Sequence, residues 1–322
     1  MIQTQCPCGS QRIRQVLLFP RDEVFISTKY IQCLDCGALR HKYHLNSEES
    51  KSYYEKNYQN DYGRSARMES IKVKQVRNSH KFIGAIKSEL ASCINSKLSV
   101  IELGSSYGYM LAELANEFEE VSFIGIEPSI EQSTFSQDAF SYLRNLSFYQ
   151  FLDQLESEHS GDPQSRLLVI SHHVIEHILS PADYLSSLQT KVNGTISHHH
   201  IVPNSFAGFL QYLKPFKLEL PTYASRASYH RQFHFAHIHY FTVSSLLIMF
   251  KNLGYAQTNV SCINLNGYSP EISIRASNYV DSIFQLEAKS NPIRTHALFP
   301  ILILLKTLIS KAIFRLPIFS LR

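Results

Sequence analysis

Short apolar runs alternate with amphipathic segments between residues 98 and 202, and this alternation constrains the fold more than any other feature of the chain. The apolar runs read LSVIELG, SFIGIEP, RLLVIS and TISHHHIV, and the segments YMLAELANEF and PADYLSSLQTKV between them have helical periodicity. Apolar strands separated by helices are typical of a parallel sheet that helices cover on both faces. A weaker strand is predicted at residues 148–155, and AQTNVSCIN and EISIRASN predict an antiparallel pair at the sheet edge. The predicted fold class is α/β, with a doubly wound and mostly parallel seven-stranded sheet.

Composition limits the class of protein. With 322 residues, of which 44% are hydrophobic, the chain is long and apolar enough to bury a full core. Its net charge of +4, from 31 Lys and Arg against 27 Asp and Glu, is too balanced to require nucleic acid as a partner. The opening MIQTQCPCGS lacks a charged region followed by an apolar run, so we expect no secretory signal, a reducing compartment and a cytoplasmic location.

Cysteines are paired near the start of the chain, with a glycine after each pair. Thiolates paired in tight turns are typical ligands of tetrahedral zinc, and the run VLLFP between the pairs suits a small β-ribbon. We predict a zinc-ribbon-like module over residues 1–46, with one structural zinc held by Cys6, Cys8, Cys33 and Cys36. The first pair has one intervening residue where zinc ribbons usually have two, which leaves a metal-free cysteine-bearing cap as the alternative. A connector and a lead-in helix are predicted at residues 47–97.

A glycine-containing turn, IELGSSYGYML, links the first core strand to its helix. Gly104 permits a tight turn, and Ser106 and Gly108 are small enough to let a ligand approach the backbone near the helix N-terminus. Glu102 precedes the turn, and Glu127 ends the next strand, where a carboxylate can accept both hydroxyls of a ribose. The sequence therefore predicts a nucleotide-binding turn whose spacing differs from the dinucleotide pattern G-x-G-x-x-G.

These motifs resemble those of the class I S-adenosylmethionine-dependent methyltransferases, whose fold is Rossmann-like. Glu102-Leu-Gly104 is similar to their first motif, Glu127 to the ribose-binding acid of their second, and RLLVISHHVIEHILSPADYL to the segment after their fourth strand. VPNS and HIHYFTVSSLLIMFKNLGY resemble their closing segments, and a cysteine-bearing module before such a domain is similar to the sugar C-methyltransferases. Ser180-Pro181 stands where these relatives usually have Asp-Pro. The resemblance implies a methyltransferase domain at residues 98–290 that binds S-adenosylmethionine through Glu102, Gly104, Ser106, Gly108, Glu127, His172 and His173.

The loop HHVIEH, residues 172–177, contains the H-x-x-E-H pattern of inverted zinc peptidases at His173, Glu176 and His177. Such a peptidase needs both histidines on one continuous helix, whereas His173 comes two residues after the end of a predicted strand. The sequence therefore disfavours a metal here, and methyl transfer itself requires none. The matched motif in sugar methyltransferases implies that His177 lies toward the acceptor as a general base; the alternative is that it only ties the loop to a carbonyl.

A long irregular insertion follows the last predicted parallel strand and ends in FHFAHIHYF. We interpret residues 205–240 as a lid over the acceptor, with His237 and His239 as further catalytic candidates and simple packing as their alternative role. Tyr58 and Tyr62, in the connector, are candidates to fold across the cofactor pocket, and surface positions are the alternative.

The tail, residues 291–322, fits neither module. Its run without charged residues, from 295 to 305, is about half the length that a bilayer span requires. Lys306, Lys311 and Arg315 are interleaved with bulky apolar residues, which predicts either an amphipathic helix in a lipid interface or packing on the protein's own domain.

The expected function is transfer of a methyl group from S-adenosylmethionine to an oxygen or carbon of a sugar or glycan intermediate. Alternatives are methylation of another small molecule, such as a quinone or lipid precursor, a nicotinamide oxidoreductase, and a nucleotide-binding protein without enzymatic activity. The expected partners are a small-molecule or glycan acceptor and, through the tail, a membrane surface, with no nucleic acid.

Overall fold

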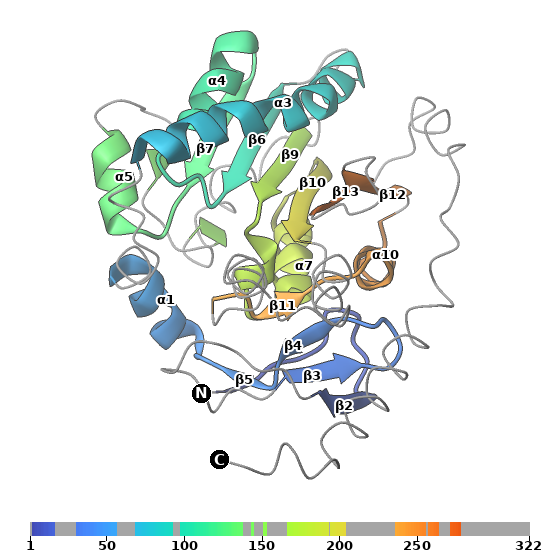
Figure 1. The fold of residues 1–322 in the computed structure, drawn as a ribbon. Helices are drawn as coiled ribbons and strands as arrows, with labels where there is room; N and C mark the ends of the chain where they lie inside the picture. The colour runs from blue at the N-terminus through green and yellow to red at the C-terminus, as the bar shows by residue number, and fades with distance from the viewer. Residues whose placement is uncertain are drawn as a thin grey trace, which may run out of the picture.

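The structure is a computed structural model, and Figure 1 shows its fold as a ribbon. It describes residues 2–16, 30–56, 68–92, 97–137, 143–144, 151–152, 166–192, 194–203, 236–255, 257–263 and 271–277. Most of the predicted lid, Tyr58, Tyr62 and the whole tail lie outside these residues. None of the described helices is long and apolar enough to cross a membrane.

A seven-stranded sheet forms the centre of the fold, in the order β12-β13-β10-β9-β6-β7-β8. Its strands are β6 Leu98–Leu103, β7 Ser122–Ile126, β8 Leu143–Arg144, β9 Arg166–His172, β10 Thr195–Pro203, β12 Gln257–Ile263 and β13 Glu271–Ser277. Five neighbouring strands of this sheet are mutually parallel: β8, β7, β6, β9 and β10. β13 is antiparallel to both β10 and β12. The predicted fold class and the predicted edge pair are therefore confirmed.

The strand order reverses between β6 and β9. From β6 the chain moves outward to β7 and β8, and it then returns to the other side of β6 to form β9. Open α/β sheets bind their ligands at the carboxyl ends of the strands where such a reversal occurs. The IELGSSYGYML turn follows β6 and the HHVIEH loop follows β9, so both motifs lie at this position (Figure 1).

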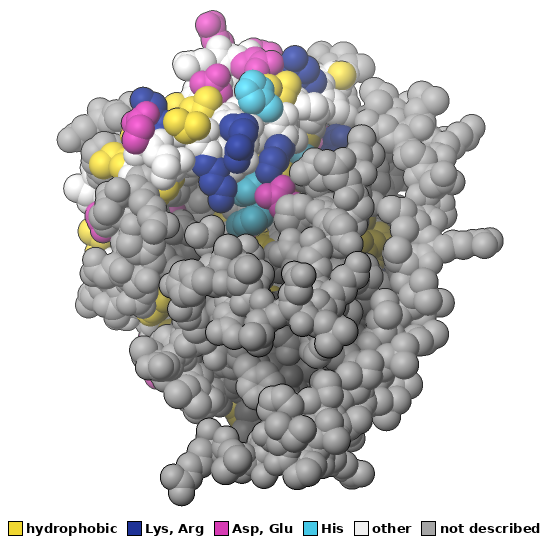
Figure 2. Space-filling model, viewed as in Figure 1, with side chains coloured by type: hydrophobic (Ala, Val, Ile, Leu, Met, Phe, Trp, Pro, Cys, Tyr) yellow, Lys and Arg dark blue, Asp and Glu magenta, His cyan; other side chains and the backbone are white. Residues whose placement is uncertain are grey.

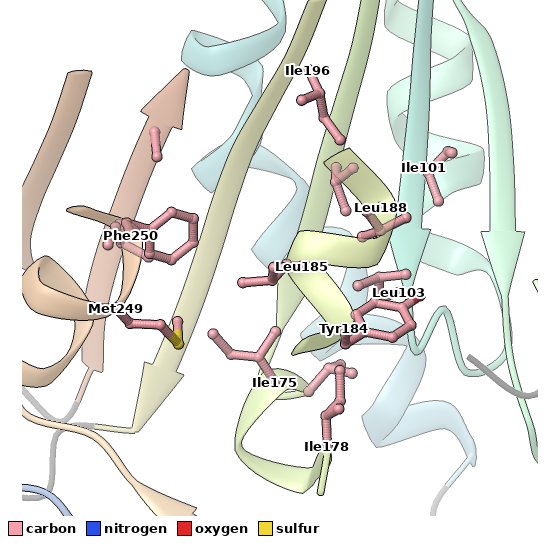
Figure 3. Close-up of a cluster of buried hydrophobic side chains, with 14 of the residues drawn as sticks. Ile101, Leu103, Ile175, Ile178, Tyr184, Leu185, Leu188, Ile196, Met249 and Phe250 are labelled. Carbon is pink, nitrogen blue, oxygen red and sulfur yellow. The ribbon is translucent and has the colours of Figure 1, made fainter. Parts of the chain in front are cut away.

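Helices cover both faces of the sheet. They are α3 Met68–Ser92, α4 Tyr109–Glu117, α5 Ile130–Gln137, α7 Pro181–Lys191 and α10 Val243–Asn252. Phe82 of α3 packs in one core cluster with Val100, whereas Leu185 of α7 and Met249 of α10 belong to the other cluster with Ile101 (Figure 3). Successive residues of β6 thus enter opposite cores, which is why its sequence is apolar without a polar alternation.

The N-terminal residues form a second, antiparallel sheet that takes one strand from the far end of the insertion. Its order is β11-β4-β3-β2, with β2 Ile13–Val16, β3 Tyr30–Cys33, β4 Leu39–His41 and β11 His239–Tyr240. A separate pair, β1 Ile2–Gln3 and β5 Tyr43–His44, leads into α1 Ser47–Lys56. The pairing of β11 with β4 seats the small sheet against the larger domain (Figure 1).

The strand predicted at residues 148–155 is wrong at residues 151 and 152, the part of this range that the structure describes. β8 is the strand next to β7, and Phe151 and Leu152 are helical instead. Both side chains are buried in the core cluster that contains Leu185. A short apolar run satisfies a buried helix as well as a buried strand, so its hydrophobicity alone does not distinguish the two.

Candidate active site

The turn between β6 and α4 holds three residues in the left-handed backbone region. Gly104 has a φ of 67°, Ser106 of 54° and Gly108 of 77°. Glycine adopts this conformation without steric cost, whereas a serine in it is strained. Backbone strain of this kind concentrates at functional sites. The N–H groups of Gly104 and Ser105 both donate to the carbonyl of Ile126, which fixes the turn against the end of β7.

Gly104 lies directly against the loop that follows β9. A Cβ atom added to Gly104 would come 2.6 Å from Cγ2 of Val174, and real Cβ contacts are essentially never this short. The Val174 side chain therefore fills the space on the Cβ side of Gly104. Glycine is required here because the turn packs closely on the HHVIEH loop.

Glu127 lies beside this turn, as its place at the end of β7 predicts. Its carboxylate is buried and accepts hydrogen bonds from the backbone N–H groups of Ser106 and Ser129, both at 2.7 Å. These two bonds fix the carboxylate beside the turn, at the end of β7 where an acid can accept the hydroxyls of a ribose.

Buried polar atoms gather at the same turn. Among the described residues, Oε2 of Glu102 and the hydroxyls of Ser105 and Ser106 have no hydrogen-bond partner. Burial, reinforced by the nearby charge of Glu127, raises the pKa of Glu102 well above its ordinary value. Proteins rarely leave buried polar atoms unsatisfied, so these atoms indicate a polar ligand at the turn.

His172 and His173, predicted to bind the cofactor, belong to an ionic cluster at the end of β9. Their rings stack with centroids 4.4 Å apart. The ammonium of Lys81 lies 2.9 Å from Nε2 of His172 and 2.8 Å from Glu271, whose other oxygen is 3.1 Å from Nε2 of His173. Figure 2 shows basic, acidic and histidine side chains together on this face. The structure therefore joins α3, β9 and β13 through these four residues, and their contact with a cofactor stays a prediction.

Burial and charge set the ionisation of this cluster in opposite directions. Burial lowers the pKa of His172 to about 4, so its ring is neutral near pH 7. Burial also disfavours the charged form of Glu271, but its contacts with His172, His173 and Lys81 outweigh burial and hold the pKa of Glu271 well below its ordinary value. The cluster thus contains one carboxylate and one ammonium, and the two rings do not need to be charged.

His177 ends the short helical turn η3, Ile175–His177, at the far side of the loop. Its Nδ1 lies 2.7 Å from the carbonyl of Ala236 and 3.1 Å from the hydroxyl of Tyr54 in α1. Because a carbonyl only accepts, Nδ1 carries the proton, and in the neutral ring Nε2 is the unprotonated nitrogen. The hydrogen bond to a carbonyl, which was the alternative role for His177, is present, and it orients the ring without removing the basic nitrogen.

Glu176 and His237 face the same point as His177. The Glu176 side chain is 1% exposed, and burial raises its pKa to about 8. Its Oε1 lies 4.0 Å from Nε2 of His177 and 3.8 Å from Nε2 of His237, and the two rings are in edge contact with centroids 4.7 Å apart. Two of the three catalytic candidates therefore meet, together with a buried carboxylate that we did not place in the site.

His239, the third candidate, lies apart from them in β11. Its ring is buried, and Nε2 donates to the carbonyl of Leu179 at 3.0 Å. Burial lowers its pKa to about 3, so the ring stays neutral. This position supports packing of the strand on the loop, and a catalytic role for His239 remains untested.

The four predicted zinc ligands converge at one point. The Sγ atoms of Cys6 and Cys8 are 3.3 Å apart, those of Cys6 and Cys36 3.5 Å, and those of Cys8 and Cys33 3.6 Å. In a tetrahedral site with Zn–S bonds of about 2.3 Å, neighbouring sulfurs are about 3.8 Å apart. The short first pair therefore does not prevent the four thiols from meeting.

Helix α10 is joined to the cysteine turns at both of its ends. The N-cap residue Thr242 donates from its hydroxyl to the carbonyl of Cys36 at 2.8 Å, and Asn252 donates from its amide to the carbonyl of Cys8 at 3.1 Å. These bonds connect backbone groups of the small sheet directly to a helix that packs on the large one.

Comparison with known proteins agrees with this geometry. A family model described as a methyltransferase domain matches residues 75–260, more than half of the chain, and the chain belongs to this family. No curated protein sequence matches.

Solved structures share the fold. The plantazolicin methyltransferase BpumL, in complex with a triazolic desmethylPZN analog and SAH, matches with a TM-score of 0.50 and 10% identity over 71% of this chain and 93% of its own. The plantazolicin methyltransferase BamL, with the same analog and SAH, has a TM-score of 0.50 and 9% identity over 71% of this chain and 94% of its own. At such identities the likeness concerns the fold alone. Family and fold together identify the chain as an S-adenosylmethionine-dependent methyltransferase.

The residues of the turn fit this cofactor. Its ribose hydroxyls suit the carboxylate of Glu127, and its amino acid portion carries charged groups that suit the buried oxygens of Glu102, Ser105 and Ser106. When bound, the cofactor supplies a methyl group already activated by its positive sulfur. The chain itself has to position the acceptor and assist the loss of its proton.

Two residues beside His177 were not identified by sequence reasoning. Tyr54 lies among repeated tyrosines, of which we selected Tyr58 and Tyr62 instead. Glu176 was read only as part of a peptidase pattern, although a single acid inside an apolar loop is a signal of unusual burial.

Replacing Glu127 by Ala should weaken binding of S-adenosylmethionine by about 10- to 100-fold, because hydrogen bonds to a charged group contribute about 1.5–3 kcal/mol. Titration calorimetry measures the effect. Glu131→Ala, an exposed acid on α5, is the matched control and should leave affinity unchanged. Equal affinities in the Glu127 variant and the wild type would contradict the ribose-binding role.

Gly104→Val should abolish cofactor binding, because the added side chain meets Val174 and the backbone has a positive φ. Gly84→Ala in α3 is the control: nothing lies within 4 Å of its Cβ position, and the change should stabilise the helix by about 0.5–1 kcal/mol. Thermal unfolding and cofactor titration distinguish the two. A Gly104 variant that binds the cofactor normally would show that the close packing is not needed.

Proposed function

We propose that the enzyme transfers the methyl group of S-adenosylmethionine to an oxygen or carbon of a sugar or glycan intermediate. The observation that carries this proposal is the position of His177: its Nε2 is unprotonated in the neutral ring and lies in the loop that packs on the cofactor turn. The resemblance of the HHVIEH segment and of the cysteine module to sugar methyltransferases supports the acceptor class.

The chemistry assigns separate tasks to the two loops. In methyl transfer the bond from sulfur to the methyl carbon breaks, its electron pair stays on sulfur, and the acceptor atom gives its electron pair to the methyl carbon and loses a proton. The turn at Gly104 holds the donor, and His177 assists the loss of the proton. Tyr54 and the carbonyl of Ala236 keep the His177 ring in the tautomer that this task needs.

The acceptor and the role of His177 are tested together. Methyl-labelled cofactor supplied with a panel of nucleotide sugars should yield a labelled product. With that acceptor, His177→Asn should lower turnover by about 10²-fold or more, because it keeps a donor toward Ala236 but lacks Nε2. Cofactor affinity should change little, and His80→Gln, an exposed histidine of α3, should behave as wild type.

Two results would count against the proposal. Undiminished turnover in His177→Asn would leave the loop as a positioning element. Transfer to a non-carbohydrate acceptor, with none to any sugar, would reject the acceptor class while keeping the methyltransferase.

We also propose that the cysteine cluster holds one structural zinc. The convergence of four buried thiols supports it, because zinc with four thiolate ligands is a closed structural site. The alternative, a metal-free cap, would leave four buried thiols in contact with one another and with no ligand between them.

Cys33→Ser should remove about one equivalent of zinc per chain, since one of four ligands is lost. Cofactor binding should persist, because the turn at Gly104 does not contact the cluster in the described residues. Turnover should fall, because β4 holds the strand that follows Ala236 and His237. Elemental analysis measures the zinc content, cofactor titration measures the affinity, and transfer of the labelled methyl group measures turnover. An unchanged zinc content would reject the site.

A further inference from the structure

The carboxylate of Glu176 is the least compensated group near the acceptor side. It is 1% exposed, and among the described residues neither of its oxygens has a hydrogen-bond partner. A buried carboxylate without donors carries a large desolvation cost, and native structures retain such groups where an ion, a water or a proton compensates them. The Nε2 atoms of His237 and His177 lie 3.8 and 4.0 Å from Oε1 of Glu176.

These three groups have the arrangement of metal ligands. Donor atoms of Glu176, His177 and His237 all lie within 4.8 Å of one another. His177 donates Nδ1–H to a backbone carbonyl, which is the outer-shell bond that orients a metal-binding imidazole and leaves Nε2 for the metal. With metal bonds of about 2.1 Å, tetrahedral ligands are about 3.4 Å apart. The distances of 3.8 and 4.0 Å from Glu176 exceed this by about half an ångström, and the donor atoms of the two histidines lie within 4.8 Å of each other, so small rotations of the side chains would close the site.

We propose that Glu176, His177 and His237 bind one divalent transition-metal ion of the zinc class, with a further coordination position open toward the acceptor. Two imidazoles and one carboxylate are a ligand set that zinc uses in sites with an open position, whereas magnesium prefers oxygen ligands. The existence of the site stands on the geometry alone. Its role in catalysis rests on the proposed function.

The neighbouring cluster of His172, His173 and Glu271 does not suit a metal, although its donor atoms are equally close. The ammonium of Lys81 already neutralises Glu271 at 2.8 Å. The two rings are stacked within 9° of parallel, so their nitrogen lone pairs run side by side and do not converge on one ion. His173 is therefore not in the same group as Glu176 and His177. The proposed metal ligands thus differ from those of the H-x-x-E-H peptidases.

A cation at this point changes how His177 acts. The ion would draw electron density from an acceptor oxygen and favour release of its proton to water, and the oxygen then attacks the methyl carbon as described above. His177 holds the ion in this arrangement, whereas without an ion the same nitrogen would take the proton itself. The two arrangements predict the same loss of turnover in His177→Asn, and metal binding tells them apart.

The test is metal stoichiometry in the full-length protein, which needs no acceptor. Apo protein titrated with zinc should bind about two equivalents, one at the thiols and one at the new site. Glu176→Gln should bind about one, with the affinity of the lost site reduced at least about 100-fold, since even outer-shell changes cost 10- to 100-fold. His80→Gln should keep both equivalents.

Controls separate a missing site from a misfolded protein. Cofactor affinity reports whether Glu176→Gln, which keeps the volume of the side chain, is folded, and His237→Asn should lose the same equivalent. Cys33→Ser should retain the second equivalent when Glu176 is intact. A wild type that binds one zinc, which disappears in Cys33→Ser and is unaffected by Glu176→Gln and His237→Asn, overturns the proposal and leaves the proposed methyl transfer standing.

Discussion

The close contact between Gly104 and Val174 sets the geometry on which the active site depends. β6 and β9 are adjacent parallel strands, so their carboxyl ends are already neighbours in the sheet. The absence of a side chain at Gly104 lets the loop after β9 settle onto the turn after β6. In the proposed function the turn holds the cofactor and the loop carries His177, so the hydrogen atom that Gly104 has in place of a methyl group would set the separation of donor and acceptor.

The second constraint is the sheet that the cysteine module shares with the larger domain. His239 and Tyr240 pair with β4, and the N–H of Ile238 donates to the carbonyl of Glu176 at 2.9 Å. The segment that carries Ala236 and His237 is thus held between the module on one side and the loop on the other. The small sheet therefore helps to position the segment that we propose faces the acceptor, and it is not only a cap on the N-terminus.

What the sequence could predict follows from how locally each feature is encoded. The strands of the core are apolar on both faces, and the glycines of the turn lie within a few residues of the strand that precedes them, so periodicity and spacing identify both. The cysteines were found because thiol pairs have few other uses. The helical Phe151 and Leu152 were misplaced because a short apolar run carries no period.

His177 and His237 were identified from the sequence as candidates, but their meeting was not, because the contacts here join distant parts of the chain. Tyr54 lies 123 positions from His177 in the sequence, and His237 follows a long insertion with no periodic pattern. Tyr54 does not differ in type from the other tyrosines of the connector, so only the folded chain distinguishes it from them. Glu176 was visible as an acid among apolar residues, but its partners were not.

The attachment of α10 to both cysteine turns has a consequence for how this architecture can vary. A shortened relative that began at the connector would lose the acceptor of the Thr242 hydroxyl and the acceptor of the Asn252 amide, and it would bare the edge of β11 to other chains. Loss of the module would therefore require compensating changes in the helix cap and in the strand edge at the same time. We therefore expect the cysteine module and the segment from β11 to α10 to change together in evolution. Exchanging the module between relatives would require exchanging β11 and α10 with it.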